Sequence, residues 1–418
     1  AVLPGYMFTD TGFWDTFRCL FPFVNLVYPS MGEKMQEGLL NTYQESGFFP
    51  EWASPGHRGC MVGNNSASVV ADAFMKNVTK ADAEKMYEGL LKGANSVHPR
   101  VSTTGRRGYE YYNKMGYVPY DVKINESAAR TLEYAYDDWT IYKTALNMGY
   151  EEVASQYRKR ALNYHHIFDK ELGFARPRYK DGSFKKEFDA LQTYGEGFIE
   201  GNSWNFSFHV PHDVFGMMKC MGGEKEFLRK LDELFGMHLP EVYYKDNEDI
   251  TADCLIGGYV HGNEPSHHIP YLYAWTSQPW KTQYWVREIM NKMYKNHIRG
   301  LGGNDDCGQM SAWYIFTAMG FYPVCPGTDE YVLGAPYLPY IKLNLTNGKT
   351  LEIKAPGVSD KKRYVKSVLL NGKPYTRMYI NHGDILNGGT LEFVMSTSPD
   401  KKRGLAKSDK PYSLTDGE

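Results

Sequence analysis

The feature that most constrains the fold is a long succession of helical patterns between Met31 and Met319. Apolar residues recur there at three- and four-residue spacing, and Gly, Pro and Asn separate the segments. About a dozen successive helices without a fixed-period repeat favour a toroid of paired helices, the (α/α)6 barrel, over a solenoid. The predicted helices lie at 31–46, 66–77, 80–92, 107–115, 126–148, 150–169, 211–220, 223–236, 266–274, 280–297 and 308–319.

The pattern changes after Pro323. Alternating apolar and polar residues, separated by NGK and NGG turns, predict strands at 340–345, 350–353, 365–370 and 390–394. So few strands cannot cover two sheet faces, so we expect them to complete a β-sandwich with strands from elsewhere. The fold is therefore predicted to be mainly α: a barrel over 1–322, a small β module over 323–400, and a polar tail over 401–418 that we expect to be frayed.

Composition excludes several classes of protein. With 47 basic and 49 acidic residues, a net charge of −2 and no long Lys/Arg run, the chain is not expected to bind nucleic acid. No apolar run approaches the roughly 18 residues that span a bilayer. The six cysteines show no CxxC spacing. Because the chain begins with Ala and a motif follows within a few residues, we expect a missing N-terminal part that includes any export signal.

Four segments combine charged, amide and aromatic residues in an unusual way. Carboxylates, amides or histidines among Gly and Trp are costly inside a helix or strand, but natural in loops that converge on a ligand. The aromatic content of 15% suits carbohydrate, whose apolar faces stack on rings while its hydroxyls need polar partners. The segments, which together predict a sugar pocket, are GFWDTFR at 12–18, EGNSWNFSFHVPHD at 200–213, HGNEPSHHIPYLYAW at 261–275 and GGNDDCGQMSAWY at 302–314.

Glu200 is the candidate general acid. It lies close in sequence to Trp204 and Phe206, and a carboxyl beside rings and away from solvent has the raised pKa that this role requires. The structural alternative is a Glu that caps or pairs with a neighbouring helix end. Glu196 is a competing candidate for the same role.

Asp305 and Asp306 are the candidates for a second catalytic carboxylate. Asp306 and Gln309 have the spacing of a capping box, so helix capping alone could explain Asp306. Capping does not explain two adjacent acids directly after a Gly-Gly-Asn sequence. Glycosidases need a second carboxylate that activates water or attacks the anomeric carbon.

The third segment could bind a metal ion. His261, Glu264 and His267 are spaced by three, as some zinc ligands are, but Pro265 interrupts a regular helix and the HExxH order is absent. Asn263 and Glu264 offer hard oxygen ligands, which suit calcium. The histidines would then be hydrogen-bonding or core residues.

Asp15 and Arg18 could present a carboxylate and a guanidinium to sugar hydroxyls, or could simply pair with each other. A functional and a purely structural role are equally open for Asp72 and for three acids on one predicted helix, where an acidic helix face is the common explanation: Glu133, Asp137 and Asp138.

Together these segments resemble the calcium-dependent exo-α-mannosidases of glycoside hydrolase family 92. The likeness covers nearly all 418 residues and also includes GCMVGNNSA at 59–67, ESAARTLEYAYDDW at 126–139 and FARPRYKDGSF at 174–184. The resemblance implies an (α/α)6 catalytic barrel whose preceding N-terminal β-sandwich domain is mostly absent from this chain. It also implies a periplasmic, cell-surface or secreted protein.

The resemblance further implies roles for individual residues. Glu200 matches the general acid, and Asp305 and Asp306 match the motif that supplies the base. Asn263 and Glu264 fall in the calcium motif. Two positions depart from the usual family pattern, with Asn205 where a metal-holding Gln is common and Asn65 where a His is common. The residues expected to bind the sugar are Trp14, Asp15, Arg18, Asp72, Trp204, His267 and His268.

The implied reaction is inverting hydrolysis of terminal α-mannosides in N-glycans or mannans, with α-1,2 linkages as the first expectation. Calcium would bind the mannose 2- and 3-hydroxyls. The implied partner is a mannose-containing oligosaccharide or glycoprotein glycan. Two alternatives remain: a metal-independent (α/α)6 glycosidase acting on glucans, and a carbohydrate-binding protein without catalysis.

Overall fold

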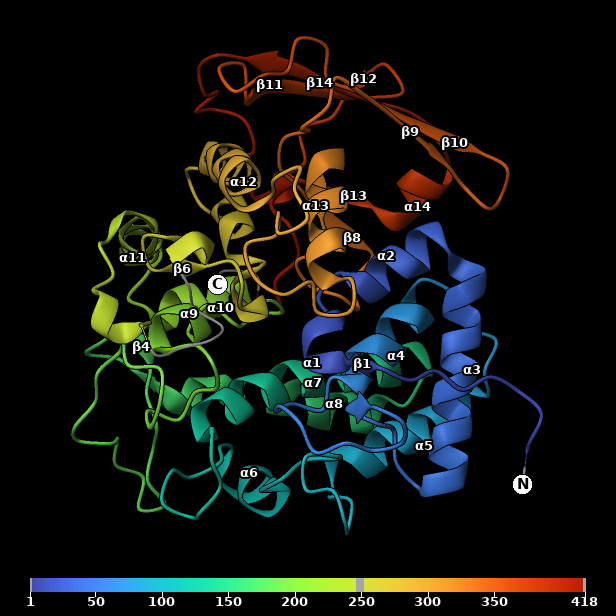
Figure 1. Ribbon diagram of the computed structural model, residues 1–418, viewed down its shortest axis with the longest axis vertical. Coiled ribbons are helices and arrows are strands. Elements are labelled where there is room, and N and C mark those ends of the chain that lie inside the picture. The colour runs from blue at the N-terminus through green and yellow to red at the C-terminus, as the bar shows by residue number, and fades with distance from the viewer. Residues whose placement is uncertain (1, 246–251, 416–418) are drawn as a thin grey trace.

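Helices dominate the first three quarters of the computed structural model, which describes residues 2–245 and 252–415 (Figure 1). Residues 1, 246–251 and 416–418, which belong to the predicted barrel and tail, lie outside the described residues. The longer helices confirm the predicted succession: α3 Pro29–Ser46, α4 Ser66–Met75, α5 Ala83–Ala94, α6 Tyr109–Met115, α7 Ser127–Asn147, α8 Glu151–Arg160, α10 Val214–Cys220, α11 Glu224–Gly236, α12 Trp280–Met293 and α13 Gln309–Met319.

Some helices differ from the prediction. The predicted helix at 150–169 ends at Arg160, and a 3₁₀ turn leads into a short hairpin. The segment predicted as a helix at 266–274 is a 3₁₀ helix, Ile269–Trp275, with a proline in its first turn. The short helices and hairpin strands are α1 Phe13–Thr16, α2 Leu20–Val27, α9 Ser203–Phe206, β1 Thr11–Gly12, β2 Trp52–Ala53, β3 Phe168–Asp169, β4 Phe174–Ala175, β5 Leu255–Ile256 and β6 Tyr259–Val260.

Helix α7 forms the centre of the first half of the fold. It packs against α4, α5 and α8, and nearly all of its residues are buried, including Glu133, Asp137 and Asp138. The interpretation of these acids as a solvent-exposed helix face is therefore wrong. Each of them needs a polar partner inside the protein, because an unpaired buried charge is costly.

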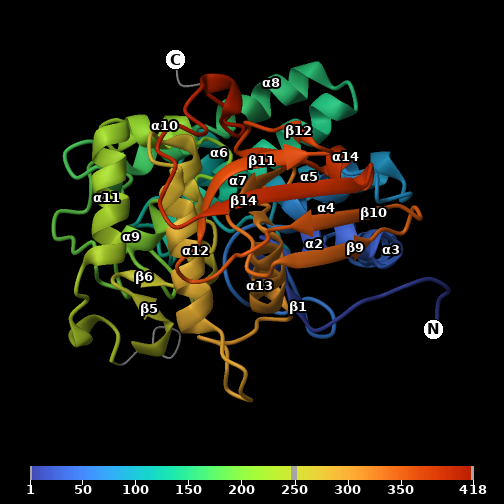
Figure 2. The same cartoon turned by 90° about the horizontal axis from the view of Figure 1, so that it is seen from above.

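The β module forms a layer on one side of the helices, next to α12 (Figures 1 and 2). Its five-stranded sheet has the order β12-β11-β14-β10-β9, with β10 parallel to β14 and the other neighbours antiparallel. One face is buried through residues such as Leu351, Ile353 and Phe393. The strands are β9 Tyr340–Asn344, β10 Thr350–Lys354, β11 Tyr364–Leu370, β12 Lys373–Pro374 and β14 Gly389–Ser396.

A second, three-stranded sheet joins the module to the helices. Its order is β13-β8-β7, and all neighbours are antiparallel. Strand β7 begins two residues after the end of α13 and pairs with β8, so α13 leads directly into the sheet. The bounds are β7 Phe321–Tyr322, β8 Glu330–Leu333 and β13 Tyr379–Asn381, which is followed by α14 His382–Leu386.

The expected fraying of the tail is wrong for the part that the structure describes. Ser413 and Leu414 are buried. The Trp139 indole N–H donates to the Tyr412 hydroxyl at 3.0 Å, and the Ser413 hydroxyl donates to Asp213 at 2.9 Å. No helix in the described ranges is long and apolar enough to cross a membrane.

The tail is also held by Glu330 of β8, which accepts the Tyr412 backbone N–H at 2.7 Å. Burial raises the pKa of Glu330 from 4.5 to about 7. Between these two pH values the carboxyl is protonated in the native state and ionised in the unfolded chain. Stability therefore falls as the pH rises from 4.5 to 7. Glu330→Gln keeps an oxygen acceptor but cannot ionise.

We expect Glu330→Gln to raise the free energy of unfolding at pH 8 by up to about 3 kcal/mol and to change it little at pH 4. Urea unfolding at both pH values measures this difference. Glu352 of β10 is the control, since its pKa is lowered rather than raised. An equal gain at both pH values would show that ionisation of Glu330 is not the cause.

Candidate active site

Four carboxylates from distant parts of the chain meet in one acidic cluster: Asp15, Glu200, Glu264 and Asp306. Asp15 lies on α1 and is buried. Burial, followed by the charges of Asp306 and Glu200, raises its pKa well above the usual value. Asp15 is thus close to both predicted catalytic carboxylates. All four residues of the cluster come from the polar segments that predicted a pocket.

Glu200 is presented by an unusual backbone conformation. Its φ is 58°, in the left-handed region that non-glycine residues rarely adopt, directly before the short helix α9. Asn202 begins α9 by accepting the Asn205 N–H with its side chain at 3.2 Å. The Asn263 amide donates to Glu200 Oε2 at 2.8 Å. This half-buried carboxyl is therefore held from a second segment while remaining open to a ligand.

The two adjacent aspartates have different surroundings. Asp305 Oδ1 accepts the Ser311 N–H at 3.0 Å and the Ser311 hydroxyl at 2.7 Å, so Asp305 secures the start of α13. Asp306 has a φ of 47° and contacts Glu264. The capping-box interpretation of Asp306 is wrong, because Asp305 provides the capping contact and Asp306 belongs to the acidic cluster.

Gln309 also differs from the capping-box prediction. Its Oε1 accepts the backbone N–H groups of Cys19 and Leu20, both at 3.1 Å, and its Nε2 lies 3.0 Å from His267 Nδ1. The side chain therefore ties the loop after α1 to the segment that contains Asn263 and Glu264.

The surroundings of Glu264 fit a hard cation. Burial, a hydrogen bond with Asp306 and the charges of Asp15 and Asp306 raise the pKa of Glu264 well above its usual value. Glu264 Oε1 and Asn263 Oδ1 are buried, and neither has a hydrogen-bond partner among the described residues. Orphaned carboxylate and amide oxygens are the ligands that calcium prefers.

The described ranges contain no three His, Cys, Asp or Glu side chains arranged to hold a metal ion. A calcium site here would therefore depend on amide or backbone oxygens in addition to Glu264. Asn205 is buried close to this segment. Its Oδ1 accepts a hydrogen bond from the Ser266 hydroxyl at 3.1 Å, and its Nδ2 donates to Asn202 at 3.1 Å. A carbonyl oxygen with one hydrogen bond keeps a second lone pair.

The histidines of this segment are hydrogen-bonded core residues. His267 Nε2 lies 2.9 Å from the His261 carbonyl, and His268 Nε2 lies 2.7 Å from the Phe208 carbonyl. Burial lowers the pKa of both His267 and His268 to about 3. Both ring nitrogens of His261 face tyrosine hydroxyls, each at 2.8 Å. Because protein groups occupy both ring nitrogens of His261 and of His267, neither residue is a zinc ligand.

Trp14 and Arg18 lie beside Asp15 but have a partner that the sequence did not indicate. The Trp14 indole N–H donates to Glu133 Oε1 at 3.0 Å, and Arg18 Nη2 lies 3.5 Å from the same oxygen. The guanidinium of Arg18 also stacks over the Trp14 ring at 5.2 Å. The partner of Arg18 is therefore Glu133, and the alternative of an isolated Asp15–Arg18 pair is wrong.

The structure places other predicted residues outside the acidic cluster. Asp72 is fully buried and accepts Lys76 Nζ at 2.6 Å, Asn25 Nδ2 at 2.8 Å and the Gly327 N–H at 3.0 Å. Both of its oxygens are thus used inside the protein. Trp204 is half-buried, with its ring 4.5 Å from that of Phe174.

Glu196, the competitor of Glu200, lies 2.9 Å from Lys185 Nζ. Asn65, which stands where a His is common, donates to Glu133 at 3.0 Å and to Asp137 at 3.3 Å.

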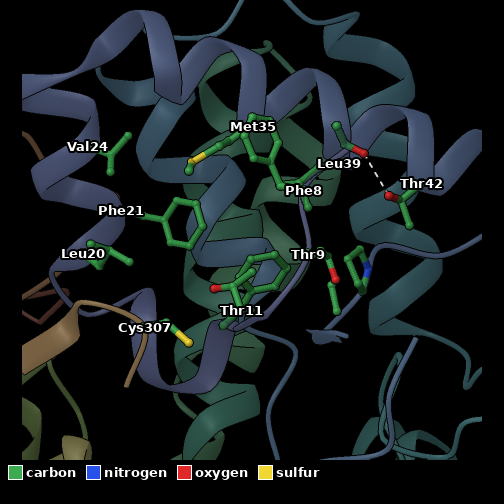
Figure 3. A pocket seen from close by; sticks show the side chains of 14 residues that line it. Phe8, Thr9, Thr11, Leu20, Phe21, Val24, Met35, Leu39, Thr42 and Cys307 are labelled. Atoms are coloured by element: carbon green, nitrogen blue, oxygen red, sulfur yellow. Dashed lines mark hydrogen bonds between the residues drawn. The ribbon is translucent and has the colours of Figure 1, made fainter. Parts of the chain in front are cut away.

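An apolar pocket of about 140 Å³ borders the loop that contains Asp305 and Asp306 (Figure 3). Phe8, Phe21, Met35 and Leu39 line it, and Cys307 forms the wall next to Asp306. Its lining offers few partners for sugar hydroxyls, so the acidic cluster is the better candidate for sugar chemistry.

Known proteins resemble this chain over most of its length. Residues 2–397 match the Glycosyl hydrolase family 92 catalytic domain. The chain belongs to glycosyl hydrolase family 92. It is also 28% identical over 413 residues to an uncharacterized secreted glycosidase of Arthroderma benhamiae, covering 91% of this chain and 51% of that protein.

Solved structures of the family superimpose on almost the whole chain. A family GH92 inverting mannosidase from Bacteroides thetaiotaomicron is 42% identical with a TM-score of 0.92, over 99% of this chain and 57% of that one. A GH92 α-mannosidase from the same organism, solved with mannoimidazole, is 36% identical with a TM-score of 0.92, over 99% of this chain and 54% of that one. The helical barrel with a β module is therefore the family fold, and this chain spans about half the length of these relatives.

Sequence reasoning missed Glu51 and left the role of Glu133 open. Glu51 is buried and accepts hydrogen bonds from the side chains of Ser66 and Asn64. Burial raises its pKa to about 7. Glu133 and Asp137 are four apart on one helix, so they lie on the same face of α7. That spacing, within a helix that is otherwise buried, is the signal that could have revealed an internal polar network.

Proposed function

We propose that this family 92 chain is the catalytic part of an exo-acting, inverting α-mannosidase that hydrolyses terminal α-mannosides. The observation that carries the proposal is the meeting of Glu200, Asp306, Asp15 and Glu264 in one half-open cluster. Two carboxylates with different surroundings are what acid and base catalysis on one glycosidic bond requires. The mannosidase relatives support mannose as the sugar, and α-1,2-linked N-glycans or mannans are the first substrates to test.

Glu200 is the proposed general acid. It donates its proton to the glycosidic oxygen as the bond to the anomeric carbon breaks, and it is left as a carboxylate. The Asn263 amide, which donates to Glu200 Oε2 at 2.8 Å, holds the carboxyl and stabilises the anion that forms. Trp204, which lies on α9 close to Glu200, is proposed to contact the sugar.

Asp306 is the proposed general base. It removes a proton from a water molecule on the face of the sugar opposite to the leaving group, and the product is β-mannose. Asp305 is the other candidate in this motif, but both Ser311 contacts engage its Oδ1. In inverting enzymes the two catalytic carboxyl groups are about 6.5–9.5 Å apart, which leaves room for the water.

Asp15 of the acidic cluster and its neighbours Trp14 and Arg18 are proposed to bind mannose hydroxyls. Asp15 offers a carboxyl acceptor, and Arg18 offers Nε, which makes no hydrogen bond to any described residue. Trp14 provides a ring edge next to both. His267 and His268 are proposed to support the residues around the sugar, because Nε2 of each ring already bonds to a backbone carbonyl.

Calcium is the proposed cofactor, and Asn263, Glu264 and Asn205 would hold it. When bound, the ion would supply a positive charge that binds the mannose 2- and 3-hydroxyls and stabilises charge in the transition state. Glu264 would hold the ion as a carboxylate, since metal ligands must be deprotonated.

We also propose that the chain works together with an N-terminal β-sandwich domain, and that the protein is periplasmic, cell-surface or secreted. The half-length match to family members supports the first proposal. The relative described as a secreted glycosidase supports the second.

The test is mannose release from α-1,2-mannobiose, assayed with any N-terminal domain that the protein carries. EDTA treatment is expected to abolish activity and added calcium to restore it, whereas magnesium should restore little because it prefers a smaller octahedral site. Activity that is indifferent to EDTA would indicate a metal-independent glycosidase. Absence of activity on every α-mannoside would favour a carbohydrate-binding protein.

A further inference from the structure

Glu133 is a fully buried acid of α7 that joins several segments of the candidate site. Its Oε1 accepts the Trp14 indole N–H at 3.0 Å, and its Oε2 accepts the Asn65 amide at 3.0 Å. His209 Nε2 lies 3.1 Å from Oε2, and Arg18 Nη2 lies 3.5 Å from Oε1. Trp14 belongs to α1, and Arg18 lies two residues after that helix. The other two partners belong to the loop before α4 and to the segment that follows Glu200.

The surroundings keep Glu133 ionised despite its burial. Burial alone would raise the pKa of this carboxyl, but His209, Arg18 and the Asn65 amide outweigh that effect and lower it to about 2. A buried carboxylate held by several donors has little freedom to move. It therefore fixes the positions of the groups that donate to it.

Arg18 is a partner of Glu133 that still has a nitrogen without a hydrogen bond to the described part of the chain. It is 5% exposed, and its guanidinium lies over the rings of Trp14 and Phe17 at 5.2 and 4.5 Å. Its Nη1 lies 3.5 Å from His209 Nδ1. Nη2 faces Glu133, and Nε makes no hydrogen bond to any described residue, so Arg18 is held in place with one nitrogen left for a ligand.

We propose that Glu133 is a positioning residue of the mannose site, which holds Trp14 and Arg18 in the geometry that receives the sugar. This inference rests on the proposed function. Glu133 itself does not touch substrate, since its side chain has no exposed surface. It acts through Trp14 and Arg18, which lie one residue before and three residues after Asp15 of the acidic cluster.

Asp137 provides a matched control. It lies one helical turn after Glu133 on α7, is equally buried, and also accepts the Asn65 amide, at 3.3 Å. Its side chain also accepts the Asn64 backbone N–H at 2.8 Å, whereas Trp14 and Arg18 contact Glu133 instead. Asp137→Asn thus disturbs the same helix and the same Asn65 contact without removing the carboxylate that holds Trp14 and Arg18.

The experiment compares kcat and KM for α-1,2-mannobiose in the wild type, Glu133→Gln and Asp137→Asn, each with calcium and any N-terminal domain. Misplacement of binding groups is expected to raise KM for Glu133→Gln at least about tenfold and to lower kcat/KM about 100-fold. Asp137→Asn should keep KM within about twofold of wild type. A merely structural role would reduce the fraction of active molecules, which lowers the apparent kcat and leaves KM unchanged.

Trp14→Phe keeps the inference testable if Glu133→Gln folds poorly, because it removes the indole donor from the other side of the same hydrogen bond. It should raise KM as Glu133→Gln does, and the two changes together should raise it less than the product of the single effects. An unchanged KM in Glu133→Gln and in Trp14→Phe, or an equal rise in Asp137→Asn, would overturn the positioning role alone. A wild type inactive on all α-mannosides would instead overturn the proposed function, and the positioning role with it.

Discussion

Replacing Glu200 with glutamine is expected to lower kcat on α-1,2-mannobiose by about 10³-fold, because the leaving sugar then departs without a proton. The loss should be much smaller on 2,4-dinitrophenyl α-mannoside, whose leaving group needs no protonation. Calcium-dependent binding of mannose should persist, since Glu200 is not among the proposed metal ligands. Steady-state kinetics on the two substrates measures this difference.

Glu196→Gln is the control for this prediction. Glu196 pairs with Lys185 at 2.9 Å, so its removal should change kcat by less than about threefold on either substrate. If Glu196→Gln showed the larger loss, or if Glu200→Gln lost activity equally on both substrates, Glu200 would not be the general acid.

Asp306→Asn is expected to lower kcat by about 10³- to 10⁴-fold on both substrates, because water activation is needed whichever group leaves. Azide, which attacks without deprotonation, should restore turnover on the dinitrophenyl substrate and give β-mannosyl azide. Kinetics with and without azide, followed by proton NMR of the product, measures both effects.

Asp305→Asn separates capping from catalysis. It weakens the Ser311 contacts at the start of α13 and is expected to cost about 1 kcal/mol of stability, with kcat within about tenfold of wild type. A larger catalytic loss in Asp305→Asn than in Asp306→Asn would move the role of base to Asp305.

Much of the helical architecture can be predicted from local patterns, because a helix depends on contacts three and four residues apart. The predicted range 126–148 and the observed α7, Ser127–Asn147, differ by one residue at each end. Sheet pairing is harder, since it depends on distant residues. The parallel pairing of β10 with β14 and the placement of β13 beside β8 left no local signal. The packing of Tyr412 against Trp139 also spans most of the chain.

In the candidate site too, local features could be predicted from the sequence and distant contacts could not. Local composition was enough to select Glu200, the Asp305–Asp306 pair, Asn263 and Glu264 as candidates, because loops that gather acids and amides among glycines are uncommon. Their partners could not be predicted. The Lys76 that neutralises Asp72 is only four residues away, but nothing in the sequence distinguishes that ion pair from a ligand site.

The contact of Arg18 with Glu133 joins residues far apart in the sequence. Which nitrogens and oxygens stay free is decided by tertiary packing, and those free groups define a binding site.

Proton NMR of the first mannose released from α-1,2-mannobiose tests the central claim most directly. In the presence of calcium, the account predicts that β-mannose appears first and then mutarotates, because water activated by Asp306 attacks the face opposite to the leaving group. Release of α-mannose as the first product would contradict direct displacement by the Glu200 and Asp306 pair.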